Sequence, residues 1–303
     1  MILLGTAAGG GYPQWNCWLP VSSAARAGDG RATPRTQSCA AVSADGVHWF
    51  LLNASPDIPR QLRRLPAAPA GAARHVPFEG VVLTDAEVDH SLGLVLLREA
   101  RHLPLWCTPA VHRILREDSG VLRMVEAFAE VPWTPLAAGV AQPLARRDGS
   151  PSGLTVEAFG VAADPPRFAT RAEPLHTVGL ELRDASGARL VYAPGIGDLD
   201  EPFLARARGA DLVLVDGTFW TDDEMIALGV GTRTARALDH VPMSGPDGSL
   251  ERLKRIGGTR TVYVHINTTN PALLADSEAR RAIEAAGIAV GHDGMEFHLT
   301  GSR

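Results

Sequence analysis

The 303-residue sequence has few cysteines and no long hydrophobic run. Its three cysteines, Cys17, Cys39 and Cys107, are odd in number and widely spaced, which favours reduced thiols over a disulfide framework. No apolar stretch reaches the ~18 residues that a membrane-spanning helix needs, and the N-terminus has neither the basic region nor the apolar region of a signal peptide. The sequence therefore predicts a soluble, cytoplasmic protein without a membrane partner.

Basic clusters are also absent. The chain has 29 Lys and Arg against 34 Asp and Glu, a net charge of -5, and no block in which basic and aromatic residues alternate. Proteins that bind the phosphate backbone usually carry such a block, so we expect no nucleic-acid partner. The composition does not change along the chain, and 45% hydrophobic residues can build one large core. We therefore predict a single domain over residues 1–303.

The glycine-rich stretch 5–11 has some features of a phosphate-binding loop and lacks the others. There is no G-x-x-x-x-G-K-[ST] motif and no acidic residue at the distance of a ribose contact. Tyr12 and Pro13 follow the glycines, where a nucleotide-binding fold would begin a helix. We do not expect nucleotide binding here.

Short apolar strands alternate with helical patterns in both halves of the chain. The predicted strands are 2–4, 39–42, 47–52, 81–84, 105–106, 154–159, 178–182, 190–193, 212–215, 261–266 and a last one near Phe297. The predicted helices are 58–65, 91–100, 109–116, 121–128, 250–256 and 277–286, and the predicted loops include 23–33 and 145–153. This order indicates an α/β fold with two packed sheets and helices outside.

One strand-to-helix turn carries four ionisable side chains, Asp85, Glu87, Asp89 and His90. Carboxylates this close together repel one another unless a positive charge lies between them, and carboxylate oxygens with an imidazole nitrogen are normal ligands for Fe, Mn or Zn. The turn therefore predicts a metal site. The alternative is an acidic helix N-terminus capped by Asp89, which leaves His90 unexplained.

Polar residues stand at the ends of apolar strands in the second half as well. Asp216 follows the strand 212–215, His265 follows 261–264, and His176 precedes 178–182. Taken alone, a carboxylate at a strand end is usually a turn residue, and a single histidine there is more often a hydrogen-bonded structural residue than a ligand.

Taken in order along the chain, these residues resemble the metal motif of the metallo-β-lactamase superfamily. Its H-x-H-x-D-H pattern falls on residues 85–90, its third histidine on His176, its bridging aspartate on Asp216 and its last histidine on His265. Acidic residues in place of the first two histidines narrow the resemblance to the coenzyme PQQ biosynthesis protein B (PqqB) family. The strings 5–17, 34–38, 52–58, 216–218, 240–245 and 264–271 are also similar to motifs of that family. The resemblance implies an α/β metallo-β-lactamase-like αββα sandwich.

The resemblance further implies a non-haem iron, O2-dependent hydroxylase acting on a tyrosine-derived (Glu-Tyr) precursor of pyrroloquinoline quinone (PQQ), which is a small-molecule or dipeptide-like substrate. His90, Asp89 and His265 are then the catalytic ligands, since two imidazoles and one carboxylate leave positions open for O2 and substrate. Glu87 and Asp216 complete or bridge the metal shell, and His176 is a further ligand or a proton donor. Fe(II) is the expected metal, with Zn and Mn as alternatives.

Two other functions stay open at this point. A metal-dependent, phosphodiesterase-like hydrolase would hold a second ion with His176 and Asp85, bridged by Asp216, and would cleave a phosphodiester or an amide. A non-catalytic carrier would bind PQQ or an intermediate without turnover. Oxygen consumption with substrate separates the hydroxylase from both.

The residues that contact the substrate are predicted by the same reasoning, from strand ends and matched motifs. Arg35 and Arg233 are candidates for binding a substrate carboxylate, although a surface salt bridge is an equal alternative for either. The other candidates for substrate binding lie in the matched motifs and are Ser55, Thr218, His240 and Asn267. For His240, a role as a core histidine is the alternative.

One departure from the PqqB pattern concerns zinc. The family's C-x-C-x-x-C zinc knuckle is reduced here to Cys17, with Leu19 and Ser22 at the other two positions. One thiolate cannot supply the three or four ligands of a structural zinc site, so we expect no structural zinc and a mobile segment over residues 17–34. The oligomeric state stays open, with a homodimer as one option.

Overall fold

The computed structural model describes residues 1–301. The first half of the chain forms a six-stranded sheet. Its strands, in spatial order, are β1 (Ile2–Gly5), β2 (Cys39–Val42), β3 (Phe50–Leu52), β4 (Gly80–Val82), β5 (Leu105–Cys107) and β6 (Trp133–Pro135). The pairs β1–β2 and β2–β3 are antiparallel, and the strands from β3 to β6 are parallel. The carboxyl end of β4 leads directly into the turn with Asp85 and His90.

The second half forms a seven-stranded sheet. Its strands are β7 (Gln142–Ala145), β8 (Pro151–Gly160), β9 (Val178–Asp184), β10 (Arg189–Ala193), β11 (Leu212–Asp216), β12 (Arg260–Val264) and β13 (Ala289–Val290), in the spatial order β13-β12-β11-β10-β9-β8-β7. Strands β7 to β10 pair antiparallel, and β10 to β13 pair parallel. Parallel strands end at the same edge of a sheet, so the residues that follow β11 and β12 come together there.

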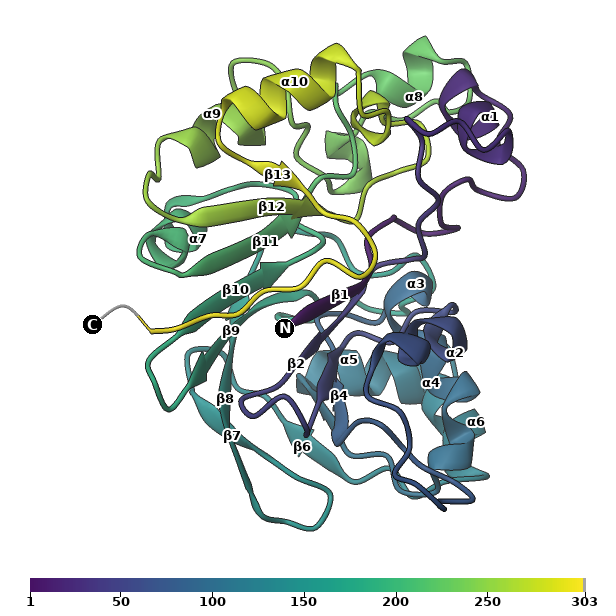
Figure 1. The fold of residues 1–303 in the computed structure, drawn as a ribbon, viewed down its shortest axis with the longest axis vertical. Coiled ribbons are helices and arrows are strands. Elements are labelled where there is room, and N and C mark those ends of the chain that lie inside the picture. Colours follow the sequence, from purple (N-terminus) through teal and green to yellow (C-terminus); the bar gives the residue numbers. More distant parts are fainter. Residues whose placement is uncertain (302–303) are drawn as a thin grey trace.

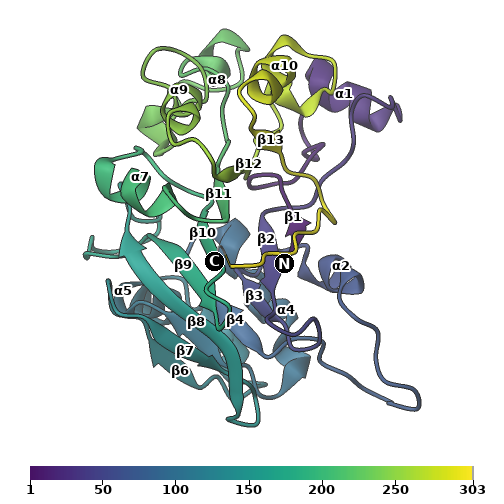
Figure 2. The same ribbon diagram turned by 60° about the vertical axis from the view of Figure 1, so that its left-hand side comes forward.

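The two sheets pack face to face, with helices on both outer faces (Figures 1 and 2). Side chains alternate along each strand: Leu3 and Leu214 lie in the core between the sheets, whereas Leu4 and Val215 face the outer helix layers. Strands β1 to β5 and β11 are buried on both faces, which explains why they are almost entirely apolar, whereas β8 alternates between exposed and buried residues. This arrangement confirms the predicted αββα sandwich.

The helices divide between the two sheets. The first sheet is covered by α2 (Ile58–Gln61), α4 (Gly93–Leu96), α5 (Pro109–Arg113) and α6 (Val121–Glu126), with α3 (Val88–Ser91) leading into α4. The second sheet is covered by α7 (Glu201–Ala207), α9 (Ser249–Lys254) and α10 (Glu278–Ala285), with α1 (Pro20–Arg26) and α8 (Glu224–Ala227) on the same half of the molecule.

Several predicted boundaries were wrong. The predicted loop 145–153 is shorter, because β7 continues to Ala145 and β8 begins at Pro151. The last strand is β13, and Phe297 instead lies in an extended segment whose backbone N–H donates to Met1 O at 2.9 Å. The predicted helix 91–100 is broken into short pieces at Leu92, because Gly93 N donates to Ala54 O at 2.9 Å and packs against that loop.

Part of the segment predicted to be mobile is helix α1. This helix has only seven residues, too few to be stable alone, so contacts with the rest of the fold hold it in place. The Tyr12 hydroxyl donates to Val21 O at 2.8 Å, and the hydroxyls of Ser22 and Thr268 lie 2.7 Å apart. A sequence pattern of Ala and Ser does not report such distant contacts.

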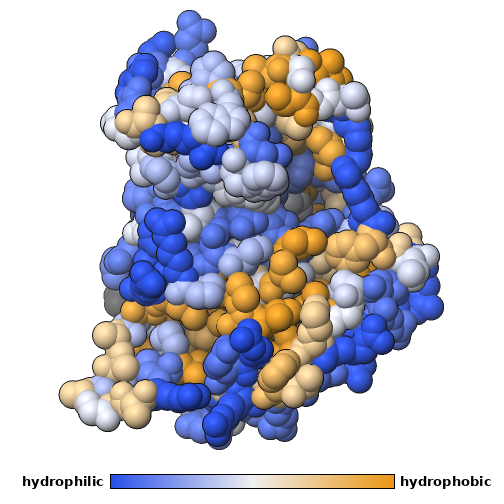
Figure 3. All heavy atoms as spheres, turned by 90° about the vertical axis from the view of Figure 1, so that its right-hand side faces the viewer, coloured by the Kyte–Doolittle hydropathy of each residue, from blue (hydrophilic) through white to orange (hydrophobic). Residues whose placement is uncertain are grey.

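One face of the molecule exposes hydrophobic side chains in its lower half, where α3, α4 and α6 lie (Figure 3). The large ones include Val88, Leu92, Leu96 and Phe128, of which Phe128 is 67% exposed. Patches of this kind often mark contact surfaces, but the predicted homodimer stays a prediction. No helix within residues 1–301 combines the length and apolar composition needed to cross a bilayer.

Candidate metal centre

The turn after β4 is held by a buried asparagine. Asn53 adopts a left-handed backbone conformation (φ 65°), and its Oδ1 accepts a hydrogen bond from Thr84 N at 2.9 Å. Its Nδ2 donates to Thr84 Oγ1 at 2.9 Å, and this hydroxyl in turn donates to Asp85 Oδ2 at 2.6 Å. The Asp85 carboxylate therefore has one fixed orientation.

Asp85 fixes the orientation of His90. The His90 Nδ1 lies 2.7 Å from Asp85 Oδ2 and 2.9 Å from Oδ1, and both residues are buried. Burial alone would raise the pKa of Asp85, but His90 and Thr84 lower it overall, so the carboxylate is ionised and accepts the Nδ1 proton. His90 Nε2 is buried and has no hydrogen-bond partner within residues 1–301. A histidine held by a carboxylate at one nitrogen and free at the other is the usual form of a metal-binding histidine.

His265 is oriented in a similar way. It follows β12 with a left-handed backbone (φ 57°), and its Nδ1 lies 2.8 Å from Thr218 Oγ1. The single hydroxyl hydrogen of Thr218 points to Asp216 Oδ1 at 2.5 Å or to His265 O at 2.9 Å, and neither of these oxygens can donate. The donor between Thr218 and His265 must therefore be Nδ1, which leaves the Nε2 lone pair free in the neutral ring.

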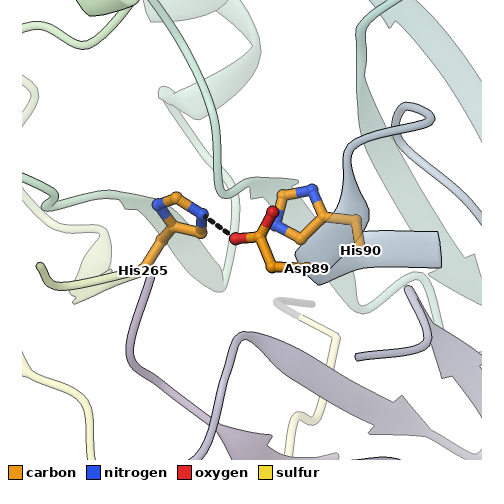
Figure 4. Close-up of side chains that lie close together, drawn as sticks. All are labelled: Asp89, His90 and His265. Atoms are coloured by element: carbon orange, nitrogen blue, oxygen red, sulfur yellow. Dashed lines mark hydrogen bonds and ion pairs between the residues drawn. The ribbon is translucent and has the colours of Figure 1, made fainter. Parts of the chain in front are cut away.

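Three ligand atoms converge at this point. Asp89, His90 and His265 each offer one atom, and these atoms all lie within 4.8 Å of one another. His265 Nε2 faces Asp89 Oδ2 at 3.0 Å (Figure 4), an arrangement of two electron-pair donors that needs a proton or a cation between them. The unpartnered His90 Nε2 adds a third donor, so the residues present fit a metal ion.

A second group of donors adjoins the first and shares His265 with it. Asp216, His240 and His265 also offer atoms within 4.8 Å of one another. Asp216 is fully buried, its Oδ2 lies 2.5 Å from His240 Nδ1, and the His240 and His265 rings stack with centroids 5.5 Å apart. Burial lowers and Asp216 raises the pKa of His240, which is raised overall.

Sequence reasoning placed His240 in the substrate wall, and the structure places it among the metal-type donors. The sequence offered only a weak signal that His240 is a metal donor. His240 and the strand-ending Asp216 are 24 positions apart, and no local pattern predicts that they meet.

Two predicted ligands lie outside both donor groups. Glu87 stands on the cavity rim, where burial and the charges of Asp85 and Asp89 raise its pKa to about 7. The His176 Nδ1 lies 3.1 Å from Thr177 Oγ1, and its ring joins neither group. Since Asp85 is already occupied by His90, the structure does not assemble a second metal site from His176 and Asp85.

Four of the five donors, Asp89, His90, His240 and His265, line a cavity of about 760 Å³. Four of the six predicted substrate-binding residues line it, namely Thr218, Arg233, His240 and Asn267. Its wall also contains five residues that sequence reasoning missed, Asp164, Arg167, Phe168, Phe219 and Asp239. They lie in loops without strand or helix periodicity, so no local pattern marked them.

Arg35 and Ser55 lie elsewhere. Ser55 is buried, and its hydroxyl donates to Gln61 Oε1 at 2.9 Å. Arg35 is also buried, forms no salt bridge within residues 1–301, and donates from Nη1 to Gly291 O. Neither side chain lines the metal cavity, so the structure gives no support to a direct contact with a substrate bound there.

Residues 48–266 match the family model of the β-lactamase superfamily domain. Coenzyme PQQ synthesis protein B of Methylobacterium nodulans is 45% identical over 305 residues, which cover 98% of this chain and 99% of the relative. The same protein of Gluconacetobacter diazotrophicus is 43% identical over 98% of each chain. The chain belongs to the coenzyme PQQ synthesis protein B family. Its membership in the metallo-β-lactamase superfamily and the family resemblance seen in the sequence are thereby confirmed.

A solved structure of this family has the same fold. Zn(2+)-bound PqqB from Methylobacterium extorquens superimposes with a TM-score of 0.89 at 41% identity, over 98% of this chain and 99% of that one. A diphosphatase of the PhnP family superimposes with a TM-score of 0.67 at 19% identity, which shows a shared fold and nothing more.

Proposed function

We propose that this chain holds a metal ion at Asp89, His90 and His265 and acts in PQQ synthesis as a non-haem iron, O2-dependent hydroxylase of a tyrosine-derived (Glu-Tyr) precursor. The observation that carries the proposal is the convergence of two imidazoles and one carboxylate, with His90 Nε2 buried and unpartnered. Two histidines and one carboxylate with open positions form the ligand set of non-haem Fe(II) oxygenases. Iron bound there would supply the activation of O2.

The protein's own residues orient these ligands. Asp85 holds His90 through Nδ1, and Thr218 holds His265 through Nδ1, so both rings direct Nε2 to the same point. Partners of this kind typically contribute 10 to 100-fold in metal affinity or activity. The zinc in the relative from Methylobacterium extorquens is compatible with the same donor set, and zinc and manganese stay alternatives to iron.

The cavity wall suits an amino-acid-derived substrate. Its volume of about 760 Å³ lies in the range of small-ligand sites, and Phe168 and Phe219 offer apolar surface for a tyrosyl ring. Arg167 and Arg233 offer guanidinium groups for substrate carboxylates. Glu87, with a pKa of about 7, can accept the phenolic proton near neutral pH.

The test is turnover with defined metals. Protein purified without oxygen is loaded with Fe(II), Zn(II) or Mn(II) and supplied with a Glu-Tyr peptide or a peptide-derived precursor. A two-electron reductant such as ascorbate is added, because insertion of one oxygen atom of O2 requires reduction of the other to water. We expect a hydroxylated product only with Fe(II) and O2, carrying oxygen from isotopically labelled O2. Oxygen-independent turnover would contradict the hydroxylase, and saturable binding without any turnover would favour the carrier.

The adjoining donor group of Asp216, His240 and His265 is the one observation that favours a metal-dependent hydrolase. A shared histidine lets two donor groups hold neighbouring ions, and two ions can generate a hydroxide for hydrolysis.

His240→Ala separates the two reaction classes. A hydroxylase should retain one iron and oxygen-dependent product, reduced by no more than ~10 to 100-fold, because His240 is not one of its three proposed ligands. A hydrolase that holds its second ion at Asp216, His240 and His265 would fall from two metal equivalents to about one and lose its activity. His176→Ala is the control, because His176 lies outside both donor groups. Metal analysis and oxygen-free assays on the same preparation distinguish these outcomes.

A further inference from the structure

A second, smaller cavity of about 250 Å³ lies beside the glycine-rich loop. Gly10, Gly11, Tyr12 and Pro13 line it, whereas Ala8, Gly9 and Gln14 of the same loop line the metal cavity. The two cavities share no lining residue. The smaller one has room for a compact polar ligand and falls below the ~300 Å³ at which sites for drug-sized ligands begin.

Three arginines line this cavity without a carboxylate partner. Arg35, Arg60 and Arg64 form no salt bridge within residues 1–301. Arg60 and Arg64 are exposed, whereas Arg35 is only 6% exposed and its Nε is buried without a hydrogen-bond partner. Burial and the neighbouring Arg280 lower the pKa of Arg35 to about 10, which leaves it charged at neutral pH. The charge of Asp293 raises the pKa of Arg35 and offsets these two effects only in part, and a buried cation without a directly paired carboxylate is costly.

Two acidic residues in the same wall are engaged by other groups. Asp57 Oδ2 accepts hydrogen bonds from Gln37 N and Nε2, both at 3.0 Å. Asp293 Oδ2 accepts from Thr36 N and Oγ1, both at 2.7 Å, and Asp293 Oδ1 accepts from Thr6 Oγ1 at 2.9 Å. With three guanidinium groups against two carboxylates, the lining carries one net positive charge.

We propose that this cavity binds a small oxyanion with at least two negative charges, such as phosphate or a short dicarboxylate. Arg60 and Arg64 contact the anion directly. The buried charge of Arg35 in the same cavity lining adds electrostatic attraction. Guanidinium is the side chain best matched to such ligands, because it offers paired N–H donors. The site does not depend on the proposed hydroxylase activity, since none of its residues belongs to the metal centre.

The test is isothermal titration calorimetry of the full-length, metal-loaded protein. Sodium phosphate and sodium malonate are titrated separately at constant ionic strength maintained with chloride, and at least one should bind at one site per chain. The double variant Arg60→Ala/Arg64→Ala should weaken this binding by ~10-fold or more for each guanidinium group removed. Both positions are exposed, so the variant should fold.

Two further variants serve as controls. Arg63→Ala removes an exposed arginine of the same 3-10 turn (Leu62–Arg64) that does not line the cavity. It should leave the affinity within about twofold, because an exposed charge that does not contact the anion is screened by solvent. His265→Ala disables the metal centre and should leave the anion binding in place. The proposal is overturned if neither anion binds, if the double variant binds as well as the wild type, or if His265→Ala abolishes binding, which would place the anion on the metal.

Discussion

His90 and His265 of the candidate metal centre each use one ring nitrogen for orientation, and the other nitrogen is available to bind a metal ion. Asp85 accepts from Nδ1 of His90, and Thr218 accepts from Nδ1 of His265. Asp85 occupies a position that is histidine in the superfamily pattern, and here its carboxylate supports His90 from behind. In the proposed site, Asp85 therefore orients the ligand His90 and is not itself a ligand.

His90→Ala and His265→Ala should each abolish tight metal binding and activity while the protein still folds. Each change removes one of three converging donors, and the hydrophobic core lies elsewhere. Mass spectrometry of the ions measures the metal content of each variant, and circular dichroism measures its folding. His292→Ala, at an exposed histidine outside the donor groups, is the control. Iron content near the wild-type level in either ligand variant would mean that the site lies elsewhere.

Metal affinity should rise with pH between about 6.5 and 9. Burial opposes protonation of His90, but Asp85 and Asp89 outweigh it and raise its pKa from 6.5 to about 9 in the metal-free protein. The protonated ring therefore contributes stability to the metal-free fold that is fully present below pH 6.5 and is lost as the pH rises through 9. A metal ion needs the unprotonated Nε2, so its affinity increases over the same interval, by up to about tenfold per pH unit. Competition with a chelator of known affinity measures this, and a flat profile would contradict it.

At the scale of elements, α1 is a short helix held by distant contacts. Cys17 lies just before it, is partly exposed, and its Sγ accepts from Ser22 Oγ at 3.1 Å. This hydrogen bond, together with the Ser22–Thr268 contact, links the start of α1 to the loop after β12. The cysteine therefore has a local structural contact of a kind that other small polar side chains can make.

Cys17→Ser should cost less than about 1 kcal/mol, since a serine hydroxyl can accept the same hydrogen bond. Cys107→Ser is the matched comparison: Cys107 is fully buried against the outer helices of the first sheet, and a hydroxyl there should cost about 1–3 kcal/mol. Denaturant unfolding measures both values. Equal losses in the two variants, or a zinc ion bound through Cys17, would contradict this interpretation.

At the scale of the whole molecule, the proposed metal ligands come from both halves of the sandwich. Asp89 and His90 follow β4 of the first sheet, and His265 follows β12 of the second. An ion bound to all three ligands therefore links segments that are 175 residues apart in the chain, from His90 to His265. Such an ion binds the folded state and not the unfolded chain.

Removing the metal should lower the unfolding temperature, and adding it back should restore it. At a free metal concentration of about 100 times Kd, the stabilisation should be about 2.7 kcal/mol. Thermal unfolding with and without a chelator measures the effect, and His265→Ala should show no response. If the chelator does not change the unfolding temperature of wild-type protein whose metal content has been measured, the metal ion does not link the two halves.

The αββα sandwich was predictable from the sequence, which also named Asp89, His90 and His265 as candidate ligands, and the structure brings these three residues together. Apolar run lengths, turn residues and the spacing within residues 85–90 are local properties, and family motifs cover nearly the whole chain. Which distant polar residues meet is set by the tertiary structure. This structure brings His240 onto Asp216, leaves His176, Ser55 and Arg35 outside the metal cavity, and places Arg35 beside a different cavity. The physical reason is that the ends of parallel strands are placed by sheet register and by the packing of loops between strands, and neither is encoded in the residues next to each side chain.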